Sequence, residues 1–374
     1  MNVRVPLSKP FIDKEDIKAV VEVLKSGFLS LGPKLPEFEK AVSDYAGVKH
    51  AIAVNSGTSA LHLCIRALGI KDGDEVITSP YSFIASSNCI LFERAKPVFV
   101  DIDEKTFNID PDKIEAAITE KTKAILVVHV FGLPAEMDRI IPIAKKHSLK
   151  IIEDSAEALG AKYKGRFAGT FGDCGVYAFY PNKQMTTGEG GIIVTNDDCI
   201  DELSRSMRSQ GRDSNNDWLR HIRLGYNYRL DEMSCALGIS QLKKIDFLLS
   251  KRESVAANYG RILSKFKEVI LPYENDSLHR SWFVYVIRLA ENVDRDKVIE
   301  NLVEKGIQSK QYFPPIHLQE FYKRELGCKE GMFPNCEKVA KGTLALPFFT
   351  SMKKSQVKEV CLALKDAIKE SKVQ

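Results

Sequence analysis

Lys183 lies in a segment whose composition suits a chemically reactive amine. The pair Tyr180-Pro181 precedes it, and the run Gly188-Glu189-Gly190-Gly191 follows it before an apolar stretch. Glycine turns on one side and an aromatic residue on the other would fix the backbone and partly bury the lysine, and a desolvated lysine loses its charge more readily. A neutral amine can attack an aldehyde, so Lys183 is a candidate for a lysine that binds pyridoxal phosphate (PLP) as a Schiff base. For lysine and glycines alone, the alternative of a surface lysine beside a glycine-rich hairpin would be preferred.

PLP requires an aldehyde partner, an acid near its pyridine nitrogen, an aromatic residue on its ring face and a cradle for its phosphate. Asp154 ends the apolar run that begins at Ile151 and is the candidate acid, since an ionised carboxylate keeps the ring nitrogen protonated. The alternative is that Asp154 caps a following helix, a position at which aspartate is common. Glu153 is the weaker candidate because successive side chains of a strand point to opposite faces.

The segment Gly57-Thr58-Ser59 is the candidate phosphate cradle, because it follows a predicted strand and precedes a predicted helix. Free amides and the dipole at a helix N-terminus favour an anion there. An ordinary capped helix start is the alternative. Phe83 or Tyr81, after the next strand, is the candidate aromatic ring, although an aromatic at a strand end is more often part of the core.

These residues need a scaffold, and the chain from about residue 13 to 245 alternates short apolar runs with amphipathic segments. We expect strands at 51–54, 75–78, 97–101, 124–130 and 150–154, and helices at 13–25, 35–45, 60–68 and 137–147. The predicted helix 13–25 carries an apolar face of Ile17, Val20, Val21 and Leu24. This alternation predicts an α/β fold, with a mainly parallel (mixed) sheet flanked by helices in a large domain.

The pattern changes after residue 241. A long helix is predicted over 243–266, an antiparallel strand over 282–289, and further helices over 293–305 and 354–369. We therefore expect residues 1–249 to form an N-terminal arm and the large PLP-binding domain. Residues 250–374 are expected to form a smaller α+β domain, with the arm packed near it.

Composition narrows the class of protein. The chain has 374 residues, of which 54 are basic and 50 acidic, and this near-balance without a basic tract gives no reason to expect nucleic-acid binding. The eight cysteines form no CxxC pair, which favours reduced thiols over a disulfide framework or a metal site. The N-terminus lacks a signal pattern, and no apolar stretch approaches the roughly 20 residues of a membrane helix. We expect a cytoplasmic protein that binds no membrane and no metal.

Several further motifs appear in a fixed order, and together they resemble the DegT/DnrJ/EryC1/StrS family of PLP-dependent sugar aminotransferases, within the fold-type I aminotransferases. The resemblance covers about residues 8–365. Its motifs are Leu31-Gly32-Pro33, Asn55-Ser56-Gly57-Thr58-Ser59-Ala60-Leu61, Gly73-Asp74-Glu75-Val76-Ile77, Lys96-Pro97-Val98-Phe99-Val100-Asp101, Ile152-Glu153-Asp154-Ser155-Ala156-Glu157-Ala158, Thr186-Thr187-Gly188-Glu189-Gly190-Gly191, Gly225-Tyr226-Asn227-Tyr228-Arg229 and Leu344-Ala345-Leu346-Pro347.

The resemblance implies a role for each matching residue. Lys183 matches the Schiff-base lysine, which later acts as a general base, and Asp154 matches the partner of the pyridine nitrogen. The other implied cofactor contacts are Phe83 on the ring, Gly57 and Thr58 at the phosphate, Glu157 near the 3′-oxygen and Asn227. Asn227 would reach the phosphate from a neighbouring subunit, which implies a homodimer with shared active sites; a simple turn residue is the alternative.

Three positions bear on the expected chemistry. Ala178, five residues before the lysine, stands where the family often has a serine that binds phosphate, so one hydrogen bond of roughly 1 kcal/mol is missing unless another donor replaces it. Glu157 stands where the family often has glutamine or histidine, which leaves its protonation state open. A related type with histidine in place of the lysine dehydrates sugars, and Lys183 argues against that reaction.

The reaction implied is transfer of an amino group from glutamate to a nucleotide-linked keto-sugar, giving an amino sugar for surface polysaccharide or glycan biosynthesis. The Thr186–Gly191 motif resembles members acting on 4-keto-6-deoxy sugars linked to UDP, GDP or dTDP. The candidate substrate contacts are Ser30, Arg229, Tyr312 and His317. For His317 a structural role, and for Arg229 pairing with an acid, are the alternatives. A 3-keto-sugar or cyclitol aminotransferase, and a PLP-binding regulator without turnover, remain the competing functions.

Overall fold

A seven-stranded sheet forms the centre of the large part of the molecule. The computed structural model describes residues 3–213 and 220–372. The strands of this sheet are β1 (His50–Val54), β2 (Glu75–Thr78), β3 (Lys96–Phe99), β4 (Thr122–Val128), β5 (Lys150–Asp154), β8 (Cys174–Ala178) and β9 (Gly191–Thr195). Their order is β1-β9-β8-β5-β4-β2-β3. Within this sheet β9 pairs antiparallel with both neighbours, and the pairs from β8 to β3 are parallel.

The central strands are buried on both faces, which explains their almost continuous apolar sequence. In β4, Leu126 and Val128 belong to the core on one face of the sheet. Ile125 and Val127, which alternate with them, belong to the core on the opposite face. The alternation follows from the two-residue period of a strand.

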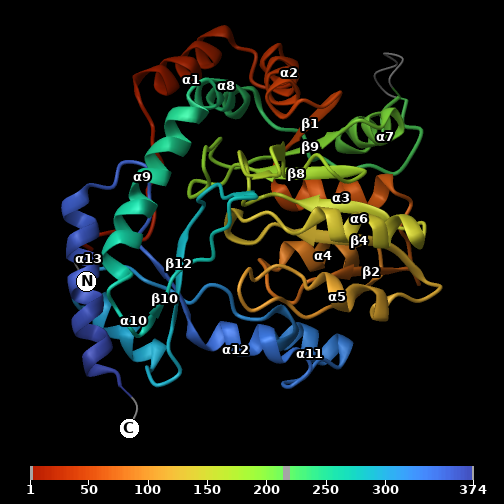
Figure 1. The fold of residues 1–374 in the computed structure, drawn as a ribbon. Coiled ribbons are helices and arrows are strands. Elements are labelled where there is room, and N and C mark those ends of the chain that lie inside the picture. Colours follow the sequence, from red (N-terminus) through yellow and green to blue (C-terminus); the bar gives the residue numbers. More distant parts are fainter. Residues whose placement is uncertain (1–2, 214–219, 373–374) are drawn as a thin grey trace.

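Helices cover both faces of the sheet, as the sequence predicts. One core joins the sheet to α3 (Gly57–Ala67), α4 (Ala85–Leu91) and α7 (Asp198–Arg208). The opposite cores join it to α2 (Lys34–Ala46), α8 (Glu232–Leu242), α5 (Pro111–Ile114) and α6 (Met137–Lys146). Figure 1 shows α2 and α8 grouped with α1 (Lys14–Ser26) on one side of β1, β9 and β8. The predicted α/β fold class is confirmed.

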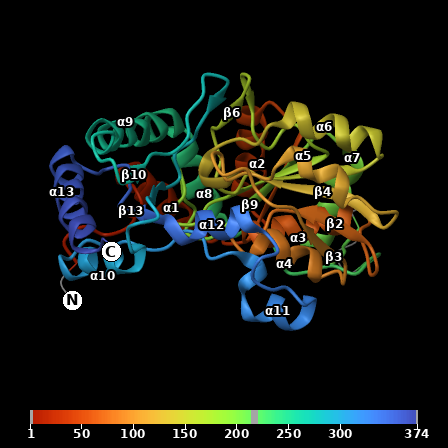
Figure 2. The same ribbon diagram turned by 60° about the horizontal axis from the view of Figure 1, so that its bottom comes forward.

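A second unit is built from the C-terminal part of the chain. Its antiparallel sheet, β10-β12-β13, consists of β10 (Val269–Ile270), β12 (Tyr285–Leu289) and β13 (Thr343–Leu346). It packs with α9 (Ile245–Leu263), α10 (Arg295–Glu304) and α13 (Lys354–Glu370), which Figure 2 shows together on the side away from β2 and β3. The short α11 (Glu320–Leu326) and α12 (Pro334–Gly342) follow α10 in the chain. A small sheet of β6 (Lys162–Tyr163), β7 (Arg166–Phe167) and β11 (Leu278–His279) connects the two parts.

The N-terminal arm packs against this second unit. Val5 forms a parallel bridge with Ile307 and belongs to the core of the unit. The helix expected over 243–266 is observed as α9. It is shorter at both ends, since it begins at Ile245 and ends at Leu263. The predicted boundary between residues 249 and 250 falls inside α9, and the division into two domains stays a prediction.

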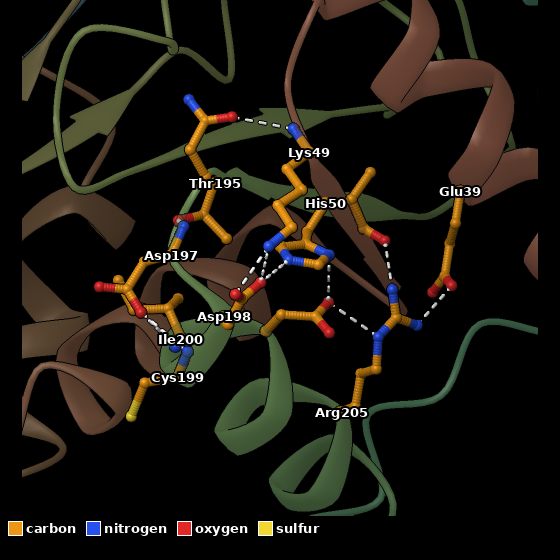
Figure 3. A network of polar contacts seen from close by, with 12 residues as sticks. Glu39, Lys49, His50, Thr195, Asp197, Asp198, Cys199, Ile200 and Arg205 are labelled. Atoms are coloured by element: carbon orange, nitrogen blue, oxygen red, sulfur yellow. Dashed lines mark hydrogen bonds and ion pairs between the residues drawn. The ribbon is translucent and has the colours of Figure 1, made fainter.

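A polar network fixes β1 between α2 and α7 (Figure 3). Arg205 of α7 donates from Nη1 to Oε2 of Glu39 at 2.6 Å and from Nη2 to the carbonyl of Ala51 at 3.0 Å. Asp198, also in α7, accepts from Nζ of Lys49 at 2.7 Å and contacts Nε2 of His50 at 2.6 Å. Because β1 leads directly to the N-terminus of α3 at Gly57, this network holds one wall of the candidate site in place.

The cysteines are all free thiols, and seven of the eight are buried. Burial raises the pKa of the Cys64 and Cys89 thiols, which keeps them protonated and weakly reactive. Among residues 3–213 and 220–372, no helix combines the length and the apolar character needed to cross a lipid bilayer.

Candidate active site

A cavity of about 500 Å³ lies where β1, β4, β5 and β8 end, the usual position of a ligand site in a parallel sheet. Segments from both parts of the chain line it. The lining residues are Ser56, Gly57, Thr58, Leu61, Ser82, Phe83, Ala85, Val128, Asp154, Ala156, Glu157, Ala178, Tyr180, Asn182, Lys183, Glu189, Gly190, Phe283, Tyr312 and Phe313. The cavity therefore brings together seven of the residues selected from the sequence.

Lys183 lies in the connection between β8 and β9, and its side chain is only 12% exposed. Its Nζ is 3.7 Å from Oε1 of Glu157 and 3.9 Å from the ring centroid of Phe283. Burial lowers the pKa of the Lys183 amine, while the charges of Glu157 and Asp154 act in the opposite direction. The amine of Lys183 therefore loses its proton, and becomes nucleophilic, more readily than the amine of an exposed lysine.

Asp154 occupies the end of β5 and presents its carboxylate to the cavity. Its Oδ2 accepts from the hydroxyl of Ser86 at 2.6 Å, and its Oδ1 accepts from the amide of Ala156 at 3.1 Å. The alternative role as a helix cap is wrong, because turns and β6 follow Asp154 rather than a helix.

Glu153 lies on the other side of β5, as strand alternation predicts, and does not line the cavity. It is fully buried and accepts from Nε2 of His129 at 2.9 Å. Its carboxylate also accepts from the amides of Gly169, Phe171 and Gly172. Glu153 therefore organises the loop beneath the site.

Glu157 contributes a second carboxylate, close to the lysine. Its Oε2 accepts from the amide of Phe131 at 2.9 Å, which fixes the side chain. Burial raises the pKa of Glu157, and the charge of Lys183 counters that effect. The two groups are held so that each changes the protonation of the other.

The first turn of α3 provides an anion-binding surface. Ser56 caps the helix by accepting from the amide of Ser59 at 3.1 Å. The amides of Gly57 and Thr58 belong to the first turn, where no acceptor exists within the helix, and both residues line the cavity. A Cβ atom at Gly57 would lie 2.9 Å from the Cβ of Ala178, so the two small residues allow this close approach.

The two candidate aromatic residues differ in position. Phe83 lines the cavity, and 60% of its surface is exposed in the single chain. Tyr81 is fully buried, and its hydroxyl donates to the carbonyl of Tyr312 at 2.6 Å and accepts from the amide of Phe313 at 3.2 Å. Tyr81 thus belongs to the core and fixes the segment that carries Tyr312, while Phe83 is available to a ligand.

Four residues selected from the sequence lie outside the cavity wall. Ser30 and Asn227 are exposed, and Asn227 forms a bridge with Ser209. Arg229 donates from Nη1 to Oε1 of Gln210 at 2.7 Å rather than to an acid. His317 is fully buried. The predicted ligand contacts of these four residues stay predictions.

His317 has a complete structural environment. Its Nε2 is 2.9 Å from Oε1 of Glu337, and its ring packs edge-on against Phe333. Burial lowers the pKa of His317, and Glu337 opposes this shift. These contacts favour the structural role that was its alternative.

Two parts of the site were missed from the sequence. Tyr180 and Asn182 line the cavity, and their position beside Lys183 in the chain was the available signal. Phe283 lies beneath the amine but is distant in sequence and carries no motif, so no local signal identified it.

The residues present fit PLP. A buried amine, a carboxylate fixed by two donors, an available aromatic ring and unpaired helix amides face one cavity. The carboxylate suits a protonated ring nitrogen, and the amides suit a phosphate. This set of donors and acceptors matches the four requirements set out from the sequence.

Comparison with known proteins agrees with this chemistry. The chain is 42% identical to GDP-perosamine synthase from Caulobacter vibrioides over 85% of its length and 87% of that protein. It superimposes on the aminotransferase PseC from Helicobacter pylori, of pseudoaminic acid biosynthesis, with a TM-score of 0.94 and 33% identity, covering 98% and 99% of the two chains. The PLP form of Spr1654 from Streptococcus pneumoniae superimposes with a TM-score of 0.93 and 28% identity, covering 99% of each chain.

A family model covers nearly the whole chain, from residue 10 to residue 365. It agrees in extent with the resemblance seen in the motifs, and the enzyme class predicted from them, a PLP-dependent aminotransferase, is confirmed. The protein belongs to the DegT/DnrJ/EryC1/StrS aminotransferase family.

Proposed function

We propose that this protein binds PLP and transfers an amino group from glutamate to a nucleotide-linked keto-sugar. One observation carries the proposal: the amine of Lys183, the carboxylate of Asp154 and the free amides of Gly57 and Thr58 line a single cavity. When bound, PLP supplies an aldehyde for the amine and a ring that accepts electrons from the substrate carbon.

The residues of the chain divide the remaining tasks. Lys183 holds the cofactor covalently and, once released, its Nζ moves a proton from the reacting carbon of the substrate. Asp154 holds a proton on the ring nitrogen through its charge. Gly57 and Thr58 bind the phosphate, and Phe83 covers the ring. The carboxylate of Glu157, 3.7 Å from Nζ of Lys183, favours the protonated form of that amine through its negative charge.

For the substrate, we propose a 4-keto-6-deoxy sugar carried by UDP, GDP or dTDP. The Thr186–Gly191 motif, which follows Lys183 and ends at the first residue of β9, supports this choice through its resemblance to members with such substrates. The likeness to GDP-perosamine synthase and to PseC supports a sugar as acceptor. Glutamate is proposed because it is the usual donor of the family.

We further propose a homodimer with shared active sites. Asn227 is exposed and free to reach another subunit, and so is Ser30. Large apolar side chains are also exposed in the N-terminal part of the chain that contains Ser30, namely those of Ile17, Leu24, Phe28 and Leu31. An apolar surface of this kind is typical of a protein interface. Sedimentation of an active monomer would contradict the proposal.

The test of function uses the purified full-length protein with PLP and glutamate. We expect formation of 2-oxoglutarate and pyridoxamine phosphate, and loss of both in Lys183→Ala. A panel of 4-keto and 3-keto sugar nucleotides and keto-cyclitols then identifies the acceptor. Turnover of a 3-keto sugar or a cyclitol alone would replace the proposed substrate, and no conversion with any amino acid would contradict the function.

A further inference from the structure

Arg252, in α9, is a buried guanidinium whose hydrogen bonds go to neutral oxygens. It is 3% exposed, and no acid within residues 3–213 and 220–372 forms an ion pair with it. Nε donates to the carbonyl of Trp282 at 2.6 Å, and Nη1 donates to Oγ1 of Thr350 at 3.2 Å. An arginine stays charged even when buried, so this is an uncompensated cation inside the protein. Burying such a charge costs solvation free energy, which here only its hydrogen bonds to neutral oxygens offset.

The same guanidinium holds the main chain at two places beside Lys183. Nη2 donates to the carbonyl of Asn182, the residue before the lysine, at 3.2 Å. It also donates to the carbonyl of Phe283 at 2.7 Å. The ring of Phe283 lies 3.9 Å from Nζ of Lys183. Arg252 therefore fixes both the peptide that carries the lysine and the ring against which its amine lies.

A second tie fixes the other side of the lysine. Gln184, the next residue, donates from Nε2 to the carbonyl of Glu157 at 2.6 Å and to Oγ of Ser281 at 2.8 Å. The turn around Lys183 is thus attached on both sides to the segment 281–283. Only the tie through Arg252 brings a positive charge.

The charges that face the amine act in two directions. The carboxylates of Glu157 and Asp154 favour the protonated amine, and Arg252 disfavours it. Tyr180, Glu189 and Tyr312 are the other titratable residues in the cavity wall. Because like charges repel in a site with little water, the guanidinium makes a second positive charge at Nζ less favourable.

We propose that Arg252 is a positioning residue for Lys183, fixing the peptide before the amine and the ring beneath it while opposing a positive charge on Nζ. The inference rests on the proposed function, in which Lys183 is the reactive amine. It adds a role for a residue that does not line the cavity and touches neither cofactor nor substrate.

The shape of arginine is essential to this role. Its planar guanidinium donates to three carbonyls and one hydroxyl at once, whereas a lysine donates from one nitrogen only. Arg252→Lys therefore keeps the charge and loses the planar guanidinium. Arg252→Gln loses the charge and keeps part of the hydrogen bonding, so the two variants separate position from charge.

The test measures the pH dependence of Lys183 methylation by formaldehyde and cyanoborohydride in the full chain prepared without cofactor. Mass spectrometry of the peptide containing Lys183 gives the rate. For Arg252→Gln we expect the midpoint of the pH profile to rise by about half a unit or more, a loss of about threefold in neutral amine below the midpoint. For Arg252→Lys we expect the midpoint to stay and the plateau rate to change.

Arg295→Gln is the matched control. Arg295 is also a buried arginine, 8% exposed, and donates from Nη1 to the carbonyls of Ala340 and Thr343, away from the cavity. It should leave the Lys183 profile unchanged. An equal shift in the control, or an unchanged midpoint in folded Arg252→Gln, would overturn the inference. If Arg252→Gln does not fold, an Arg252→Lys profile identical to wild type overturns it.

The two proposals fail in different ways. A wild-type protein that transaminates while Arg252→Gln keeps the wild-type profile contradicts the positioning role alone. A wild-type protein without transamination contradicts the proposed function, whatever the labelling shows.

Discussion

Oε1 of Glu157 lies 3.7 Å from Nζ of Lys183, inside a cavity that leaves both side chains little exposed. Burial raises the pKa of the Glu157 carboxyl and lowers that of the Lys183 amine, and each charge counters the shift of the other. The two groups therefore differ less in proton affinity than a glutamate and a lysine in water. A proton can be exchanged between them at a smaller cost than on the surface.

Removing the carboxylate should lower the pKa of Lys183 further. In Glu157→Gln the amide oxygen can still accept from Phe131, but the charge that stabilises the protonated amine is lost. We expect the midpoint of Lys183 methylation in the cofactor-free chain to move to lower pH, by about one unit. Glu115→Gln, which removes an exposed carboxylate paired with Lys146, is the control. A midpoint that moves upward would contradict the account.

Asp154→Asn should remove activity without unfolding the protein. The amide keeps the shape of the carboxylate and one acceptor for Ala156. It carries no negative charge, so it no longer favours a protonated ring nitrogen. We expect the rate of pyridoxamine phosphate formation from glutamate to fall by about 100-fold or more. Stopped-flow spectroscopy measures this rate, and thermal melting checks the fold.

The neighbouring residue provides the contrast. Glu153→Gln replaces two acceptors with one acceptor and a donor, although four donors converge on that carboxylate. We expect a loss of about 2 kcal/mol or more in the free energy of unfolding. If Glu153→Gln slowed the reaction and Asp154→Asn only destabilised the fold, the assignment of the two carboxylates would be reversed.

Ala178→Ser should strengthen cofactor binding. Ala178 lines the cavity beside Gly57, so a hydroxyl there adds a donor next to the free amides of α3. One added hydrogen bond is worth at least about 1 kcal/mol, and we expect the Kd for PLP to fall by about fivefold or more. Fluorescence titration measures it, with Ala19→Ser in α1 as the control. Weaker binding in Ala178→Ser would show that the phosphate lies elsewhere.

His317→Gln should change the pH dependence of stability rather than catalysis. Because burial lowers the pKa of His317 below its ordinary value of 6.5, the unfolded chain binds a proton more readily than the folded one. Stability is therefore lost as the pH falls through 6.5 toward the folded-state pKa. We expect thermal melting of His317→Gln to depend less on pH in that range.

The control is His279→Gln, since His279 is exposed. The rate per folded molecule should be unchanged in His317→Gln. A variant with wild-type stability and a reaction slowed more than tenfold would restore His317 as a substrate contact.

The sequence predicted the parts of the site that follow strand ends. Lys183, Asp154 and Gly57 each lie beside an apolar run or a glycine turn, so a local pattern identifies them. Arg252 and Phe283 had no such pattern. Their role depends on contacts between segments far apart in the chain, since Arg252 is 70 residues from Asn182. The fold must bring such segments together before their chemistry is apparent.

The face on which a helix packs was also beyond the sequence. The apolar residues Ile17 and Leu24 of α1 are exposed, while Asp16 is buried. Asp16 accepts from the hydroxyl of Ser240 at 2.6 Å and from Nε2 of Gln241 at 2.7 Å. Hydrogen bonds to α8 therefore orient the helix and leave Ile17 and Leu24 exposed in the single chain, which the periodicity alone could not indicate.

Attachment of the cofactor to Lys183 is the central claim, and one measurement tests it directly. The full-length protein is incubated with PLP, reduced with borohydride and digested, and the peptides are mapped by mass spectrometry. We expect a single phosphopyridoxyl group in the wild-type protein, on the peptide that contains Lys183. Asp154→Asn should carry no more of this group than the wild type. A group on another lysine, or none at all in a folded protein saturated with PLP, would contradict it.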